Sequence, residues 1–138
     1  MTSEFLRAPV SNGNPREQAL IRRWWLDSCR GKGEIVWEYH IDGYYIDAIW
    51  IKDSPNHGKE NPGRETSIKF PLKGQKIVLC EAKIKLTPEL IGQALVYSKL
   101  LDKTGPEIEG TIIFCERSNA AITSVAIEFG LRVVEYNV

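Results

Sequence analysis

Two segments of the sequence place charged side chains where apolar ones are expected. Asp47 interrupts the apolar and aromatic run at residues 44–51, and Glu81 and Lys83 follow the apolar run at 77–80. A carboxylate among such neighbours costs several kcal/mol unless a charge or hydrogen bonds compensate it. Two carboxylates about 5 Å apart repel each other by about 3 kcal/mol, and a shared divalent cation reverses the sign of that interaction. The pattern therefore indicates a cation site beside a lysine.

This arrangement requires two neighbouring strands. Residues 34–39 and 44–51 are rich in β-branched and aromatic residues, and the Asp42-Gly43 pair between them is a hairpin signal. Residues 76–85 are predicted as a third strand, which brings Asp47 beside Glu81 if it pairs with the second. Alternation predicts two faces of the second strand, one with Tyr45, Asp47, Ile49 and Ile51, the other with Tyr44, Ile46, Ala48 and Trp50.

Helices are expected on either side of these strands. Asn14 is predicted to cap a helix that continues to Cys29, with Glu17 completing a capping box. Thr87 is predicted to cap a helix that ends near Asp102, and another helix follows Asn119 as far as Phe129. Strands at 111–115 and 131–136 complete the order α-β-β-β-α-β-α-β. This order predicts an α/β fold with a mixed sheet flanked by helices.

The composition is that of one globular domain over residues 1–138. Of the 138 residues, 43% are hydrophobic and 26% are charged. Residues 1–13 are expected to be a loose N-terminus, and residues 52–75 a loop or hairpin insertion. With no apolar run long enough for a bilayer and no leader-like start, the expectation is a soluble cytoplasmic protein without a membrane partner. Three widely spaced cysteines are expected as small core residues: Cys29, Cys80 and Cys115.

The net charge of zero hides an uneven distribution. Residues 54–85 carry seven basic and three acidic residues, and residues 34–53 carry one basic and five acidic residues. Basic segments flanking an acidic one are compatible with a polyanion held over a cation site. The tyrosines at 39, 44 and 45 are expected to pack within strands rather than to stack on bases. The candidates for phosphate contacts are Arg22, Arg23, Lys69, Lys73 and Lys85.

With Asp47 in the second strand and Glu81-Ala82-Lys83 in the third, the chain resembles the PD-(D/E)XK nuclease superfamily, which has the restriction-endonuclease-like fold. Gln93 and Tyr97 on the next helix are similar to the Gln-x-x-x-Tyr motif of its RecB-type exonuclease branch, and archaeal Holliday junction resolvases also belong to the superfamily. Two departures are an isoleucine before Asp47, in place of proline, and the insertion at 52–75.

The resemblance implies a Mg²⁺-dependent deoxyribonuclease. Asp47, Glu81 and the backbone carbonyl of Ala82 would hold Mg²⁺ or Mn²⁺, and Lys83 would orient or activate the attacking water. Glu17 matches the accessory acid that many members carry on the first helix, and Gln93 and Tyr97 would steady the site or the nucleic-acid backbone. By analogy a homodimer acting on DNA is one expected assembly.

Less specific readings stand beside these. The three charged residues of the strands could form a structural salt bridge, and Glu17 could serve only as a helix cap. A catalytically silent version of the fold, binding nucleic acid or a protein partner, is the first alternative function, and an unrelated α/β domain is the second. The sequence leaves open endonuclease against exonuclease action, and DNA against RNA.

Overall fold

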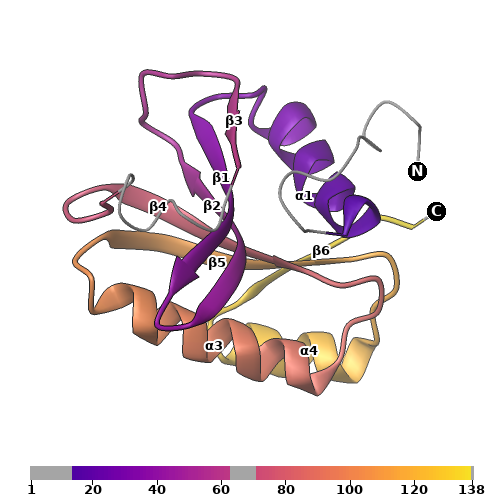
Figure 1. Ribbon diagram of the computed structural model, residues 1–138. Helices are drawn as coiled ribbons and strands as arrows, with labels where there is room; N and C mark the ends of the chain where they lie inside the picture. Colours follow the sequence, from indigo (N-terminus) through magenta and orange to yellow (C-terminus); the bar gives the residue numbers. More distant parts are fainter. Residues whose placement is uncertain (1–13, 63–70, 138) are drawn as a thin grey trace.

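The computed structural model describes residues 14–62 and 71–137. The expected order of elements is confirmed, with one additional short strand. The elements, coloured along the chain in Figure 1, are α1 (Pro15–Ser28), β1 (Glu34–Ile41), β2 (Tyr44–Ile51), β3 (Lys59–Asn61), β4 (Lys76–Ala82), α3 (Pro88–Asp102), β5 (Glu107–Cys115), α4 (Ala120–Glu128) and β6 (Arg132–Glu135).

The strands form one mixed six-stranded sheet in the order β3-β1-β2-β4-β5-β6. β2 pairs antiparallel with both β1 and β4, whereas β4, β5 and β6 run parallel to one another. Figure 1 shows α1 on one side of the sheet and α3 and α4 on the other. The α/β class and the mixed sheet between helices are therefore confirmed.

Apolar side chains fill both interfaces between the sheet and the helices. On the α1 side, Leu20, Ile21, Trp24 and Trp25 pack against residues of β1, β2, β4 and β5. On the opposite side, Leu101 of α3 packs with the isoleucines of β2, and Ala94 of α3 packs with Ala126 of α4. The spacing of three and four residues along α1 explains this burial, because it puts its apolar residues on one face.

Short sequence signals set the ends of the elements. The side chain of Asn14 accepts hydrogen bonds from the amides of Arg16 and Glu17, and Thr87 and Asn119 cap α3 and α4 in the same way. Asp42 and Gly43 both have positive φ angles, 48° and 82°, as the tight turn of a β-hairpin requires.

One expectation about strands is refined and two are corrected. The segment 52–75, expected as a loop or hairpin insertion, contains β3, which pairs in parallel with the start of β1. β4 ends at Ala82 rather than at Lys85, although Lys85 forms an isolated bridge with Arg117. β5 begins at Glu107, four residues before the expected start. The expectation of a loose N-terminus at 1–13 lies outside the described residues.

The segment that leads to β3 is held by buried polar groups. Glu34, at the start of β1, accepts hydrogen bonds from Ser54 Oγ at 2.6 Å and from Asn61 Nδ2 at 2.7 Å. The Gly33 amide donates to His57 Nδ1 at 2.8 Å. These hydrogen bonds hold residues 54–61 against the edge of the sheet, so this part of the predicted insertion contributes to the fold.

Gly33→Ala is expected to destabilise the fold strongly. Gly33 has φ +68°, and a Cβ there would collide with the carbonyl oxygen of Ile51 and lie 2.8 Å from Lys52 Cα. Strain and overpacking together predict a loss of about 2–4 kcal/mol in the free energy of unfolding, measured by urea denaturation. Gly43→Ala is the control, because Gly43 has φ +82° but a Cβ added there would have no atom within 4 Å, and its loss is expected near 1 kcal/mol. Equal losses in the two variants would contradict the close approach at Gly33.

All three cysteines are free thiols. Cys80 and Cys115 are buried, and Cys29 is half-buried against the core on the α1 side, as expected of small core residues. Within the described part of the chain, none of the helices has the length and hydropathy needed to span a bilayer.

Candidate functional site

The pairing of β2 with β4 brings the two anomalous acids together. Ala48 is opposite Cys80 in this antiparallel pair, so the next position places Asp47 beside Glu81. The Ala82 amide donates a hydrogen bond to Asp47 Oδ2 at 2.8 Å. The two carboxyl groups lie within hydrogen-bonding reach of each other when one carries a proton. The expected juxtaposition of Asp47 and Glu81 is therefore confirmed.

The alternation of side chains between the two faces of the sheet is interrupted in β1 and β2 at the position of Asp47. Glu38 lies opposite Asp47 in the hairpin register and has a φ of 47°, a left-handed conformation unusual for a non-glycine residue in a strand. Ile46 packs in the same cluster as Ile49 and Ile51, on the α3 side. The predicted alternation, which placed Ile46 on the opposite face from these two isoleucines, is wrong. Strict alternation fails because the hairpin distorts where Glu38 and Asp47 meet.

Glu81 differs from the other buried acids of the described residues. Its side chain is 0% exposed, and neither carboxylate oxygen has a partner at standard hydrogen-bond geometry among the described residues, although the Asp47 amide lies close enough to lower its pKa. By contrast, Glu34 accepts from Ser54 and Asn61, and Glu116 accepts from Arg16. A buried carboxylate without a donor is costly, so this group calls for a cation or a proton.

The surroundings of the two acids disfavour two negative charges. Burial, and then the charge of Asp47, raise the pKa of Glu81 well above its ordinary value. Burial also raises the pKa of Asp47, and two hydrogen bonds offset part of that increase, one from the Glu81 carboxyl when it carries a proton and one from the Ala82 amide. In the absence of a cation, the pair therefore holds a proton more tightly than free carboxylates do.

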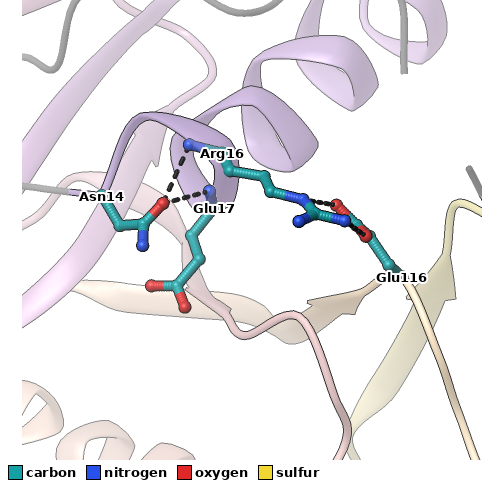
Figure 2. A network of polar contacts seen from close by, with 4 residues as sticks. All are labelled: Asn14, Arg16, Glu17 and Glu116. Atoms are coloured by element: carbon teal, nitrogen blue, oxygen red, sulfur yellow. Dashed lines mark hydrogen bonds and ion pairs between the residues drawn. The ribbon is translucent and has the colours of Figure 1, made fainter.

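A small pocket of about 20 Å³ opens beside Asp47. Such a volume holds about one water-sized particle. Glu17 lines it from α1, and Figure 2 shows its side chain extending from the first turn of the helix near Asn14. Burial raises the pKa of Glu17, while Lys83 lowers it and Asp47 raises it. The pocket is lined by Asn14, Glu17, Gln18, Ile21, Glu38, Asp47 and Ala82.

An ion pair sets the position of the start of α1. Arg16 donates through Nε to Glu116 Oε2 at 2.7 Å, and its Nη2 donates to the other carboxylate oxygen (Figure 2). The Glu116 amide in turn donates to the Ile84 carbonyl at 2.9 Å, directly after Lys83. Arg16 therefore links the helix that carries Glu17 to the segment that carries Lys83.

The remaining predicted catalytic residues lie around the same point. Lys83 is exposed and lies close enough to Asp47, Glu81 and Glu17 to lower the pKa of each. Tyr97 is half-buried, and its pKa is raised by burial and then by the charges of Glu81 and Asp47. Gln93 is half-buried one helical turn before Tyr97. Asp47 therefore lies near Glu81, Lys83, Glu17 and Tyr97 individually, whereas Gln93 is placed only by its helix.

The basic residues predicted to contact phosphate are dispersed. Arg22 is 1% exposed, forms an ion pair with Glu60 at 2.8 Å and lies over the Trp37 ring, so its guanidinium is engaged inside the protein. Arg23 pairs with Asp27 and lies over the ring of Tyr136. Lys73 lines a separate groove, and Lys85 is exposed two residues after Lys83. Lys69 lies outside the described residues.

Two contributors to the site are not predicted from the sequence. Glu38 could have been found by counting back from the Asp42-Gly43 turn, because the hairpin register sets it opposite Asp47. Glu116 follows the apolar run at 112–115, the same signal that marks Glu81.

Asp47 and Glu81 offer the hard oxygen ligands that Mg²⁺ and Mn²⁺ prefer, and the unpartnered oxygens of Glu81 fit such an ion. Among residues 14–62 and 71–137, no three His, Cys, Asp or Glu side chains gather closely enough to hold an ion by themselves. The role of Glu17 as a ligand stays a prediction. No protein-family model, curated protein or solved structure matches the chain.

Proposed function

We propose that this protein is a metal-dependent nuclease that hydrolyses phosphodiester bonds of DNA, built on a restriction-endonuclease-like fold. The proposal is supported by a helix followed by an antiparallel hairpin, by β4, which ends in Glu81-Ala82 directly before Lys83, and by a following helix that carries Tyr97 near both acids. The order of these elements and the spacing of the charged residues agree with the resemblance noted in the sequence.

The state of Glu81 carries the proposal. A carboxylate that served only to stabilise the fold would be expected to have donors, as Glu34, Glu60 and Glu116 do. Among the described residues Glu81 has no donor at standard hydrogen-bond geometry, although the Asp47 amide lies close enough to lower its pKa, and the Asp47 carboxylate beside it adds a second negative charge. Without a cation the two carboxylates repel each other, so their proximity is unfavourable. With a bound cation each carboxylate is attracted to the ion, and the same proximity becomes favourable.

The chain's own residues supply the remaining functions. Asp47, Glu81 and the Ala82 carbonyl would hold Mg²⁺ or Mn²⁺, which when bound supplies a Lewis acid for the phosphate and lowers the pKa of a water. Lys83 orients the attacking water and stabilises negative charge on the phosphate through its ammonium group. The Ala82 amide fixes the orientation of Asp47 through its 2.8 Å hydrogen bond. Tyr97 borders the site from α3 and, together with Gln93 one turn earlier on the same helix, would steady the nucleic-acid backbone.

A catalytically silent module is the second candidate. It is favoured by one observation, namely that the described residues contain no group of three acidic, histidine or cysteine side chains able to hold an ion. In this case the same surface would bind nucleic acid or a protein without cutting it.

An activity assay separates the two candidates. Labelled single-stranded, double-stranded and branched DNA are incubated with the protein in Mg²⁺, Mn²⁺ or EDTA, and the products are resolved on gels. Cleavage is expected only with metal. Lys83→Met is expected to lower the rate by about 100-fold or more, because positioned proton-transfer and charge-stabilising groups contribute on that scale. Lys99→Met is the control, since Lys99 is an exposed lysine in the last turn of α3.

Two results would count against the nuclease. DNA binding in EDTA with no cleavage in either metal would identify the silent module. Cleavage that is equal in the wild type, Asp47→Ala and Lys83→Met proteins would assign the activity to a contaminant.

A further inference from the structure

The end of the β1–β2 hairpin exposes aromatic rings beside the candidate site. Tyr44 is 53% exposed and Tyr45 is 37% exposed, whereas Tyr39 on the neighbouring strand is 4% exposed. The expectation that these tyrosines pack within strands is therefore confirmed for Tyr39 and wrong for Tyr44. Tyr44 lies opposite Ile41, which packs on the α3 side of the sheet, whereas Tyr45 lies opposite His40 on the other face. An exposed aromatic side chain beside a candidate site often marks a binding surface.

Each exposed ring is held by a second ring. Tyr44 lies 5.8 Å from Tyr97, measured between ring centroids, with 45° between the planes. Tyr45 lies 4.9 Å from His40, with 37° between the planes. Because the partner rings limit their rotation, the two tyrosines present relatively fixed surfaces to a ligand.

The Tyr44 pair reaches the candidate site. Tyr97 borders Asp47 and Glu81 closely enough to respond to the charges of both acids. Tyr44 itself is three residues from Asp47, which corresponds to about 10 Å along an extended strand. A ligand that contacts the Tyr44 ring therefore has its next chemical groups near the two acids.

An open groove of about 540 Å³ lies near the same end of the hairpin, and of the second pair only His40 lines it. Its walls include Tyr39, His40, Leu72 and Pro71, and its charged residues are Lys73 and Asp42. The opposite charges of Lys73 and Asp42 balance, so the groove suits aromatic and apolar groups better than phosphates. The bases of a nucleic acid are flat and uncharged, so they match the aromatic and neutral walls of the groove, while the charged backbone would remain outside it.

We propose that Tyr44, backed by Tyr97, forms a stacking platform for unpaired bases, so that the substrate of the site is single-stranded or carries unpaired bases next to the cleaved phosphodiester. This inference deepens the proposed function and rests on it. In a fully paired duplex the faces of the bases are stacked on one another, so only unpaired nucleotides can use the platform. The exposed Lys83 and Lys85 would contact the backbone of the same strand.

Binding measured in EDTA tests the platform independently of cleavage. Fluorescence anisotropy is followed with a short labelled single strand of mixed sequence and with the corresponding blunt duplex. Tyr44→Ala is expected to weaken binding of the single strand by about 5- to 150-fold, the usual range for loss of one stacked base, and to change duplex binding little. Tyr44→Phe keeps the ring and is expected to stay within about twofold of the wild type. Phe129→Ala is the matched control, because Phe129 is 59% exposed at the end of α4, and no change is expected.

The outcomes separate the platform from the nuclease. The platform would be overturned if the wild type bound single strand and duplex equally, or if Tyr44→Ala left the affinity for the single strand unchanged. It would also be overturned if the protein bound no nucleic acid, or if it selectively bound a protein partner. If the wild type and Tyr44→Ala cleaved duplex DNA equally, the platform would be overturned and the nuclease proposal would stand. Ring-dependent binding of the single strand without cleavage in Mg²⁺ or Mn²⁺ would support the platform and remove the nuclease.

Discussion

Glu81→Gln is expected to reduce metal-dependent DNA cleavage by at least about 100-fold while making the metal-free protein more stable. The amide keeps the shape of the side chain but removes the negative charge that a divalent cation needs. The same amide can donate a hydrogen bond to Asp47, which in the native protein faces a second acid. A gain of about 1–2 kcal/mol in the free energy of unfolding is expected, since hydrogen bonds to charged groups contribute on that scale. Gel assays and urea denaturation in EDTA measure the two effects.

Glu60→Gln is the matched control for this result. Glu60 accepts hydrogen bonds from Arg22 Nη2 at 2.8 Å and from Trp37 Nε1 at 2.9 Å, so its charge has partners inside the protein. Its neutralisation removes the negative charge with which the buried Arg22 pairs and is expected to destabilise the fold by about 3 kcal/mol without affecting the chemistry of the folded fraction. If Glu81→Gln instead destabilised the protein as Glu60→Gln does, Glu81 would be a structural acid, and the silent module would be favoured.

The features that the sequence predicts correctly depend on neighbours along the chain. Asp42 and Gly43 specify a tight turn, and the turn aligns β1 with β2. Asn14 and Thr87 mark the starts of two helices because a side-chain oxygen there satisfies free amides. Pairing of the second and third predicted strands then places Asp47 beside Glu81. The central pair of the site follows from such local signals, together with one assumption about which strands pair.

The features that the sequence does not predict depend on contacts between distant segments. Arg22 is a surface charge by type, and only the approach of Glu60, 38 residues later, makes it a buried ion pair. β3 has just three residues and forms because β1 offers it an edge. Glu38 adopts a left-handed conformation that no propensity favours, and this distortion moves Ile46 to the other face. Unfavourable local conformations of this kind gather at functional sites and are maintained by the surrounding structure.

In EDTA, the stability of the protein is expected to fall as the pH rises from about 5 towards 8. The pKa of Glu81 is raised well above its ordinary value of 4.5 in the folded protein, and the pKa values of Asp47 and Glu17 are raised as well. Above the unfolded pKa, the folded state therefore binds more protons than the unfolded state does. Stability is fully present below the unfolded pKa and is lost as the pH passes through the folded pKa. Thermal unfolding in EDTA at several pH values measures this loss.

Mg²⁺ is expected to reverse this loss, because binding to the folded state replaces the proton with a cation. A concentration of Mg²⁺ about 100 times its dissociation constant stabilises the folded state by about 2.7 kcal/mol. The effect should grow with pH, since the carboxyls must release their proton before they bind the ion. Glu81→Gln is expected to remove most of the pH dependence and the Mg²⁺ response together, because both arise from the same buried carboxyl. If Mg²⁺ still stabilised Glu81→Gln, the ion would bind elsewhere. If the stability of the wild type in EDTA did not change with pH, Glu81 would have a hydrogen-bond or charge partner in solution.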